Sequence, residues 1–308
     1  MAYITGSNKD DVIPGPGINN NGHDVIYALS GNDTVDGGLG NDRIYGGGGN
    51  DTLTDTSGHN TLYGENGNDI LTTGSGNDTL DGGSDDDTLD AGEGNNKLYG
   101  GNGNDSLTAG NGDDSLYGGN GTDILFAGNG KNKLDGGIGN DTLTSGTGDD
   151  TLSGGNDNDT LSSGAGQDVL DGGNGNDILD GGGDADTLKG GLSADDLTGG
   201  GGNDRFVYGH HLESKVGAED DIIDFAAGDL IDVSGIDAVA AFGINGLIIK
   251  DAVNNAFTFI GAGAFTGAQG QLRYAGGVVE GDINGDTVAD FAINVLGAPA
   301  LTATDFVL

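Results

Sequence analysis

The sequence predicts an all-β fold in which short strands stack into a solenoid. A nine-residue repeat runs without insertion from Asn19 to Val207. The eighth position of every repeat is apolar, and Gly accounts for 67 of the 308 residues, about three times the usual share. A fixed period is the signature of a repeat architecture, and the segment around each apolar residue is long enough only for a short strand. This region is therefore predicted to form stacked coils.

The register of the repeat assigns each position a place in the coil. The sixth position is an acid or amide from Asp24 to Asp204, and the eighth is apolar from Ile26 to Phe206. Because successive side chains of a strand point to opposite faces, the apolar column forms the interior. Two repeats make one coil, with successive turns on opposite sides. A degenerate copy, Gly6–Ile13, precedes the regular array.

Composition and charge exclude several classes of protein. The chain has 10 Lys+Arg against 50 Asp+Glu, a formal net charge of −40, so it would be repelled by nucleic acid. No apolar run is long enough for a membrane span. The absence of Cys excludes a disulfide scaffold and a thiol enzyme. Low hydrophobicity with high net charge is typical of disorder, so a folded chain requires something that neutralises the acids.

The repeats resemble those of a known family. Gly46–Thr54 and Gly172–Asp180 match the repeats-in-toxin (RTX) nonapeptide GGxGxDxUx, a calcium-binding pattern. The resemblance implies a right-handed parallel β-roll, with calcium between successive turns on each side. The residue types suit this ion, because Gly leaves backbone carbonyls bare, Asp adds a hard oxygen, and calcium takes six to eight such ligands.

The sixth positions supply the predicted calcium ligands of the roll. If one ion sits between adjacent turns of the same side, the roll holds at most about 19 calcium ions. The predicted ligands are Asp24, Asp33, Asp42, Asp51, Asp69, Asp78, Asp87, Asp105, Asp114, Asp123, Asp141, Asp150, Asp159, Asp168, Asp177, Asp186, Asp195 and Asp204.

The two sides of the predicted roll differ. We call the turns that begin at Ala28 and at every second repeat thereafter the even turns, and those that begin at Asn19 and at every second repeat thereafter the odd turns. All even turns have Asp at the sixth position, whereas three odd turns have Asn60, Asn96 and Asn132. An amide brings no charge, so calcium sites there are expected to be weak or absent. Either these positions have drifted neutrally, or lysines such as Lys97 and Lys133 partly replace the charge of the metal.

A tyrosine column occupies the ninth position of the odd repeats. It contains Tyr27, Tyr45, Tyr63, Tyr99 and Tyr117, all predicted to point outward. One interpretation is stacking between coils that covers the backbone. The other is an aromatic strip that binds a polysaccharide or a partner surface.

From Tyr208 the nine-residue period stops, and a small β-rich domain is predicted over 208–308. Aliphatic and aromatic segments separated by Gly, Asn or Asp predict its strands, and a helical turn or two is expected at Ile236–Phe242. The predicted strands are Ile222–Phe225, Leu230–Val233, Leu247–Ile249, Phe257–Ile260, Gln271–Tyr274 and Phe291–Val295.

This C-terminal region resembles the domain that follows the repeats in serralysin-type metalloproteases. The matching segments include Asn203–Tyr208, Ile222–Phe225, Ile231–Ile236 and Asp305–Leu308. The resemblance implies a domain that caps the roll and carries an uncleaved signal for the type I secretion apparatus of bacteria. Export is therefore expected although the N-terminus lacks the features of a signal peptide. The expected organisation is a lead-in with one degenerate repeat (1–18), a β-roll of 21 nonapeptides (19–207) and this domain (208–308).

A separate acidic motif lies near the C-terminus. Asp282, Asn284, Asp286 and Asp290 stand at relative positions 1, 3, 5 and 9, and Val288 offers its carbonyl between them. Oxygen donors at this spacing could surround one further calcium ion. The alternative is a plain acidic hairpin turn.

The sequence predicts no enzyme. The serralysin zinc site requires HExxHxxGxxH, and the chain has only His23, His59, His210 and His211. The expected function is that of a secreted, extracellular or surface-associated calcium-binding protein whose roll folds on extracellular calcium. One alternative is a carbohydrate-binding module that uses the tyrosine strip on cell-surface polysaccharide. Another is the non-catalytic C-terminal part of a secreted metalloprotease or alginate epimerase.

Overall fold

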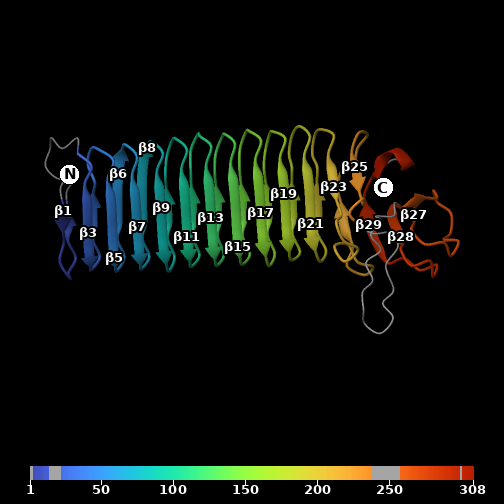
Figure 1. The fold of residues 1–308 in the computed structure, drawn as a ribbon, viewed down its shortest axis with the longest axis horizontal. Helices are drawn as coiled ribbons and strands as arrows, with labels where there is room; N and C mark the ends of the chain where they lie inside the picture. The colour runs from blue at the N-terminus through green and yellow to red at the C-terminus, as the bar shows by residue number, and fades with distance from the viewer. Residues whose placement is uncertain (1–2, 14–21, 237–256, 299) are drawn as a thin grey trace. The chain divides into compact units, whose positions relative to one another are not determined.

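The computed structural model describes residues 3–13, 22–236, 257–298 and 300–308 (Figure 1). The chain divides into two compact units, Met1–Asp168 and Val169–Leu308. Within the described ranges both units are built from β-strands, and the helical content is one 3-10 turn, η2 (Ala303–Asp305). The all-β class predicted from the sequence is confirmed.

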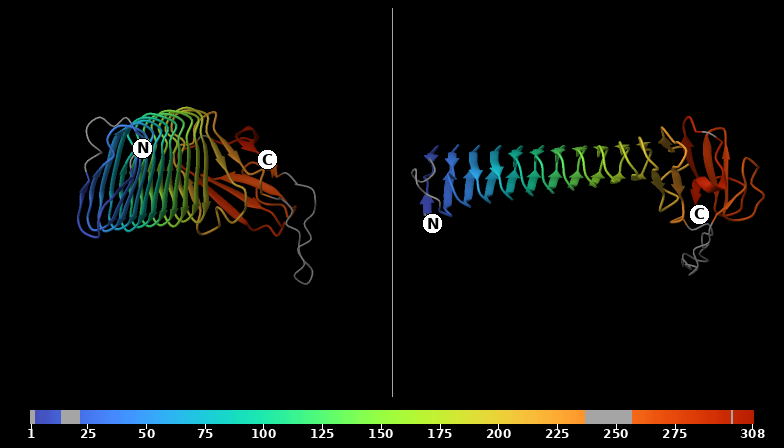
Figure 2. Two further views of the ribbon diagram at one scale, coloured as in Figure 1. Left: turned by 60° about the vertical axis from the view of Figure 1, so that its left-hand side comes forward. Right: turned by 90° about the horizontal axis from the view of Figure 1, so that it is seen from above.

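The first unit is a parallel β-solenoid with two sheets (Figure 2). One sheet runs in the order β1 (Tyr3–Thr5), β3 (Val25–Ser30), β5 (Arg43–Gly48), β7 (Thr61–Asn66), β9 (Thr79–Ser84), β11 (Lys97–Asn102), β13 (Ser115–Asn120), β15 (Lys133–Ile138), β17 (Thr151–Asn156). The other runs in the order β2 (Val12–Ile13), β4 (Thr34–Asp36), β6 (Thr52–Ser57), β8 (Ile70–Ser75), β10 (Thr88–Asp90), β12 (Ser106–Thr108), β14 (Ile124–Phe126), β16 (Thr142–Thr144), β18 (Thr160–Ser162). The predicted parallel β-roll is thereby confirmed.

The strand register follows the coil of two repeats. Ile26 pairs with Ile44, and Ile44 pairs with Leu62, so the eighth positions of alternate repeats stack directly. These side chains are fully buried, while their neighbours along the strand are partly or fully exposed. The alternation that the sequence shows at each apolar position is thus the in–out alternation of a strand.

The lead-in contributes a coil of its own. β1 pairs with β3, and β2 pairs with β4, so that Ile4 lies beside Ile26 and Ile13 lies beside Val35. The partners in these pairs are further apart in the chain than those of the regular array, because the degenerate copy is out of phase with it. The Pro14–Gly17 segment between them lies outside the described residues.

The second unit also contains two sheets. One runs in the order β19 (Val169–Asn174), β21 (Thr187–Leu192), β23 (Arg205–Val207), β25 (Leu230–Asp232), β30 (Phe306–Val307), with all pairs given for these strands parallel. The other runs in the order β20 (Ile178–Asp180), β22 (Asp196–Thr198), β24 (Asp220–Ile222), β29 (Phe291–Val295), β28 (Val278–Asp282), β27 (Gln271–Ala275), β26 (Thr258–Phe259). Among the described pairs of this sheet, β27–β28 and β28–β29 are antiparallel.

Parallel pairing continues after the nine-residue period ends. Leu197 pairs with Ile222, and Phe206 pairs with Ile231, although each pair spans more of the chain than one regular coil. Hence Tyr208 marks the end of the sequence repeat but not the end of parallel pairing. The proposed boundary at 207/208 remains a prediction.

Most predicted C-terminal strands have counterparts in the structure. β29 has the predicted bounds Phe291–Val295, while β24, β25, β26 and β27 overlap their predicted segments. The strand prediction missed β28, which lies between β27 and β29. Leu247–Ile249 and nearly all of the helical turn expected at Ile236–Phe242 lie outside the described residues. No helix in the described part of the chain has the length and apolar character needed to cross a membrane.

Candidate metal centre

The turns of the roll are tight and depend on Gly at particular positions. In the even turn that begins at Gly46, Gly47 and Gly49 have φ values of +112° and +120°, a region that L side chains rarely adopt. Gly46 is required for another reason. A Cβ on it would lie 2.4 Å from Asp51 Oδ2 and 2.9 Å from the Gly64 carbonyl oxygen of the next even turn. A carboxylate oxygen and a carbonyl oxygen therefore face the same small space.

The same convergence recurs along the even side. A Cβ on Gly100 would lie 2.4 Å from Asp105 Oδ2 and 2.6 Å from the Gly118 carbonyl oxygen. One on Gly118 would lie 2.4 Å from Asp123 Oδ2 and 2.7 Å from the Gly136 carbonyl oxygen. In these even turns the carboxylate of one turn is thus paired with a carbonyl of the following turn.

The predicted ligands form ladders within each unit. The backbone N–H of Asp33 donates to Asp51 Oδ1 at 2.7 Å, and that of Asp51 donates to Asp69 Oδ1 at 2.7 Å. The odd side has the same arrangement, for example from Asp24 N–H to Asp42 Oδ1 at 2.7 Å. One oxygen of each carboxylate thereby ties a coil to the preceding coil.

The other carboxylate oxygen is buried and has no hydrogen-bond partner in most of these residues. This holds for Oδ2 of Asp33, Asp42, Asp51, Asp69, Asp78, Asp87, Asp105, Asp114, Asp123, Asp141, Asp150 and Asp195. A buried charged oxygen without compensation is costly. On the even side from Asp33 to Asp141 such an atom recurs at every coil, and this row therefore needs cations beside it. On the odd side between Asp42 and Asp150 it recurs only at every second coil.

Burial also raises the pKa values of these carboxyl groups. Burial, together with the nearby carboxylates of Asp69 and Asp105, raises the pKa of Asp87 to about 8. Burial likewise raises the pKa of Asp69 and of Asp141 to about 7. A dication placed in the column would favour the ionised form instead.

The donor set fits calcium. No three acidic or histidine side chains gather around one point anywhere in the described ranges, so a site combines at most two carboxylates with backbone carbonyls. Oxygen-only sites of this composition suit a hard cation that accepts many ligands in flexible geometry. They do not suit zinc, which prefers four nitrogen or sulfur ligands.

Comparison with known families gives the same answer. The family model described as RTX calcium-binding nonapeptide repeat matches nine overlapping or adjoining segments, from 18–53 to 171–206. The chain belongs to this family. None of the curated proteins matches it. RTX repeats bind calcium, so the chain is a calcium-binding protein. The assignment of the ladder carboxylates as its ligands remains a prediction. The matches end at residue 206, and the serralysin resemblance of the region beyond stays a prediction.

Three residues outside the RTX repeats extend the ladders, and the sequence analysis missed them. Asp11 N–H donates to Asp33 Oδ1 at 2.6 Å, Asp195 N–H to Asp220 Oδ1 at 3.1 Å, and Asp204 N–H to Asp229 Oδ1 at 2.9 Å. The regular period could not find them. The available signal is an acid placed two residues before a buried apolar residue, as in Asp220–Ile222 and Asp229–Ile231.

Two further carboxyl groups that the sequence analysis missed are strongly perturbed. Burial and the neighbouring Asp195 raise the pKa of Asp220 to about 9. Asp55, which stands at the first position of an odd turn where many repeats have Gly, is fully buried, and burial together with Asp42 raises its pKa to about 8. Both Asp55 and Asp220 keep an Oδ2 without a hydrogen-bond partner. They are additional candidate ligands.

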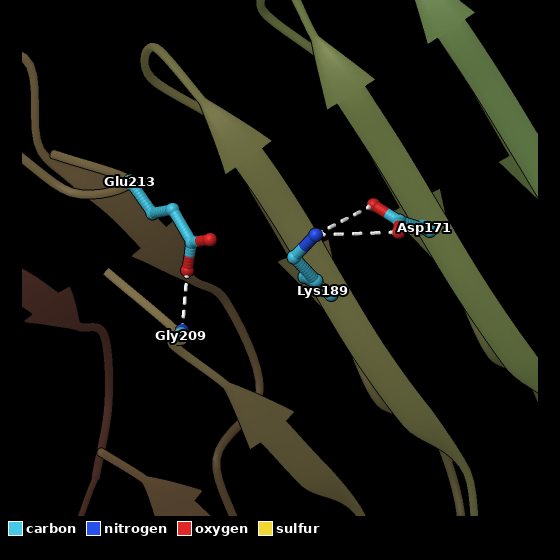
Figure 3. Close-up of polar contacts among 4 residues, drawn as sticks. All are labelled: Asp171, Lys189, Gly209 and Glu213. Carbon is cyan, nitrogen blue, oxygen red and sulfur yellow. Dashed lines mark hydrogen bonds and ion pairs between the residues drawn. The ribbon is translucent and has the colours of Figure 1, made fainter. Parts of the chain in front are cut away.

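Other acids of the second unit have protein partners (Figure 3). Lys189 Nζ lies 3.3 Å from Asp171 Oδ2 on the outward surface of the adjacent strands β19 and β21. Glu213 Oε2 accepts the backbone N–H of Gly209 at 2.6 Å. These two contacts distinguish structural acids from the ladder carboxylates.

The tyrosine column is a stack of rings. The ring centroids of Tyr27 and Tyr45 are 4.8 Å apart, and those of Tyr45 and Tyr63 are 4.9 Å apart. Tyr99 and Tyr117 form a second stack at 5.2 Å. Because the planes are nearly parallel, the ring faces cover one another. This geometry is the one expected for stacking between coils.

The acidic motif near the C-terminus closes on itself. Asp282 Oδ1 accepts the Gly285 N–H at 2.6 Å, and Asp282 Oδ2 accepts the Thr287 N–H at 3.0 Å. Asp290 Oδ2 accepts the Ile283 N–H at 2.7 Å. These bonds are those of an acidic turn, the alternative interpretation of this motif. A calcium ion held by Asp282, Asn284, Asp286 and Asp290 remains a prediction.

Proposed function

We propose that this chain is a secreted bacterial calcium-binding protein whose roll folds when it meets extracellular calcium. The observation that carries the proposal is the row of buried Asp Oδ2 atoms without hydrogen-bond partners, exemplified by Asp87 and Asp105. Membership of the RTX repeat family supports both the ion and the extracellular setting.

Folding and metal binding are expected to be coupled. Each coil buries two large apolar side chains, such as Leu62 and Leu71, while all the residues of two repeats must be ordered against conformational entropy. The formal net charge of −40 opposes folding as well. Calcium stabilises the folded roll because its ligands come together only when coils stack.

The calcium affinity expected for the roll determines on which side of the membrane it folds. Extracellular calcium modules typically bind in the range of about 10⁻⁴–10⁻³ M, well above the free calcium level of a cytosol. The roll is therefore proposed to stay unfolded before export and to fold outside. An unfolded chain suits passage through the type I secretion apparatus, for which the C-terminal residues Asp305–Leu308 are the proposed end of the signal.

We propose a structural or surface-associated role without catalysis. The ladder carboxylates are committed to hydrogen bonds between coils and to calcium, so they are poor candidates for acid–base chemistry. The carbohydrate-binding alternative is less favoured, because the stacked faces of Tyr27, Tyr45 and Tyr63 cover one another instead of facing a sugar. A non-catalytic part of a metalloprotease or epimerase remains an alternative, which an assay of the native secreted assembly would address.

Circular dichroism with defined metals tests the proposal. At a pH above the raised pKa values of the buried Asp side chains, the spectrum in excess chelator should be coil-like, and millimolar calcium should restore the β signal cooperatively. Magnesium is the control, because it demands near-octahedral geometry and loses its water reluctantly. A β-rich spectrum that persists in chelator at this pH would refute calcium-coupled folding.

A further inference from the structure

The odd side of the first unit alternates carboxylate and amide. From Asp42 to Asp150 the sixth positions are Asp42, Asn60, Asp78, Asn96, Asp114, Asn132 and Asp150. The backbone ladder is intact throughout, with N–H to Oδ1 distances between 2.6 and 3.0 Å. From Asp78 to Asp150 each gap between adjacent odd turns is consequently flanked by one carboxylate and one amide, whereas the gap between Asp42 and Asn60 also has the buried carboxylate of Asp55.

The second amide atom of each Asn has partners. Asn96 Nδ2 donates to the carbonyl oxygens of Gly92 at 3.3 Å and Gly94 at 3.1 Å. Asn132 Nδ2 donates to those of Gly128 at 3.3 Å and Gly130 at 3.0 Å. The Asn orientation is fixed, because Oδ1 faces a backbone donor while Nδ2 faces two acceptors.

Asn60 repeats this arrangement. Its Nδ2 donates to the carbonyl oxygens of Asp55 at 3.1 Å and Ser57 at 3.4 Å. In all three turns an N–H group approaches turn carbonyls of its own repeat. The corresponding atom of an even-turn Asp, such as Asp105 Oδ2, has no hydrogen-bond partner.

On the odd side, side-chain hydroxyl groups donate hydrogen bonds to further backbone carbonyls. Thr73 Oγ1 donates to the Ala91 carbonyl oxygen at 3.0 Å, and Ser145 Oγ donates to the Ser163 carbonyl oxygen at 2.9 Å. All four residues stand at the first position of odd turns, where even turns almost always have Gly. Side-chain donors thus take turn carbonyls at a position where nearly all even turns have Gly, which has no side-chain donor.

Lysine does not supply the missing charge. Lys97 Nζ lies 5.0 Å from the ring centroid of Tyr99, and Lys133 Nζ lies 5.3 Å from that of Tyr117. Both ammonium groups are engaged with the outward tyrosines. The hypothesis that these lysines replace the metal therefore finds no support in their positions, and the Asn amides are the groups that occupy the turns.

We propose that between Asp78 and Asp150 calcium is held on the even side, and that on the odd side the Asn amides close the turns without metal. The inference rests on the proposed calcium binding of the roll. The even gaps from Asp33 to Asp159 are all flanked by two carboxylates, whereas the odd gaps have half the charge and turn carbonyls taken by side-chain donors. This stretch of the protein has one edge that binds calcium and one edge closed by hydrogen bonds.

Isosteric substitutions on the two sides test the inference. Asn96→Asp should add about two calcium ions per molecule, because it restores carboxylate pairs with both Asp78 and Asp114. Asp105→Asn, its mirror on the even side, should remove about two, because Asp105 borders the gaps toward Asp87 and Asp123. The readout is bound calcium per folded molecule by equilibrium dialysis, with circular dichroism confirming the fold.

The outcomes are distinguishable. If wild-type protein binds no calcium, the proposed function fails. If wild-type protein binds calcium and Asp105→Asn loses ions while Asn96→Asp gains none, the proposed function stands and the odd-side inference is overturned. Asn96→Ala is the second variant, in case added charge prevents folding. It should keep the wild-type number of ions, and a change in that number would also overturn the inference.

Discussion

The backbone N–H of Asp69 donates to Oδ1 of Asp87 at 2.8 Å, while Oδ2 of Asp87 is buried without a hydrogen-bond partner. The two oxygens of one carboxylate therefore have different tasks. One sets the stacking of successive coils, and the other is available to a cation. This division explains why an acid at the sixth position couples strand register to calcium.

The first prediction compares alanine substitutions on the two sides. In saturating calcium, Asp105→Ala should cost about 3 kcal/mol or more of unfolding free energy, because its carboxylate borders two gaps. Asn96→Ala should cost only about 1–2 kcal/mol, the loss of buried hydrogen bonds. Thermal unfolding in calcium measures both.

The relative stabilities of Asp105→Ala and Asn96→Ala should change when calcium is removed by a chelator. Asp105→Ala then loses only the hydrogen bond from the Asp87 N–H to its Oδ1, whereas Asn96→Ala still loses the bonds of both its amide atoms. Asp105→Ala should therefore no longer cost more than Asn96→Ala. Acid conditions that retain residual structure permit this measurement. Equal effects of the two substitutions in both conditions would contradict the asymmetry between the sides.

The second prediction concerns pH without calcium. The folded-state pKa is about 8 for Asp87 and about 7 for Asp69 and Asp141, above the value of about 3.9 in an unfolded chain. The folded roll thus binds more protons than the unfolded chain at intermediate pH, and its stability falls as pH rises. Stability is fully present below about pH 4 and is lost as pH rises to about 8.

Circular dichroism of chelated protein at an acidic pH near the unfolded-state pKa and at an alkaline pH above the folded-state values checks this dependence. The β signal should be larger at the acidic pH. With saturating calcium the direction should reverse, because protons compete with the ion for the carboxylates. Identical spectra of the chelated protein at the two pH values would count against the prediction.

The third prediction concerns the glycine cradle. Gly100→Ala should weaken calcium binding, because its Cβ would lie 2.4 Å from Asp105 Oδ2 and 2.6 Å from the Gly118 carbonyl oxygen. Gly48→Ala is the matched control, since the nearest atom to its Cβ, Ser30 Oγ, is 4.0 Å away. Calcium titration should show a higher folding midpoint for the first variant alone. Equal midpoints would exclude the Gly100 space as part of the site.

The fourth prediction concerns export. Deletion of residues 249–308 should block secretion, because the resemblance to serralysins places the type I signal at the C-terminus. Deletion of residues 1–19 is the control and should leave secretion intact, although it removes β1 and β2 from the first unit. The measurement is the ratio of protein in medium and cells. Efficient export of the C-terminal deletion would rule out the proposed signal.

The fifth prediction concerns the tyrosine stack. Tyr45→Ala should destabilise the calcium-loaded protein by about 1–2 kcal/mol, because Tyr45 stacks on both Tyr27 and Tyr63. Tyr27→Ala is the comparison and should cost less, since that ring stacks on Tyr45 alone among the described aromatic pairs. Glycan-array binding that disappears with Tyr63→Ala plus Tyr99→Ala would instead favour the carbohydrate-binding alternative.

The sequence by itself determined the repeating part of the fold. The inward column of Ile26, Ile44 and Leu62 and the acid or amide at each sixth position follow from a period that is local and uninterrupted. A strand's alternation and a turn's need for Gly act within a few residues, so the order of the chain is enough to predict them. The calcium family follows from the same pattern.

The tertiary structure decided which carboxylate accepts a hydrogen bond from which backbone N–H group. Asp220 and Asp229 lie beyond their donors Asp195 and Asp204 by more than one regular coil, and Asp11 lies before its acceptor Asp33 by a similarly irregular step. The tertiary structure also decided that the Asn96 amide turns toward Gly92 and Gly94. These contacts depend on how the coils stack and on the length of each turn. A hydrogen bond requires a particular distance and angle between its atoms, and no local sequence pattern encodes that geometry.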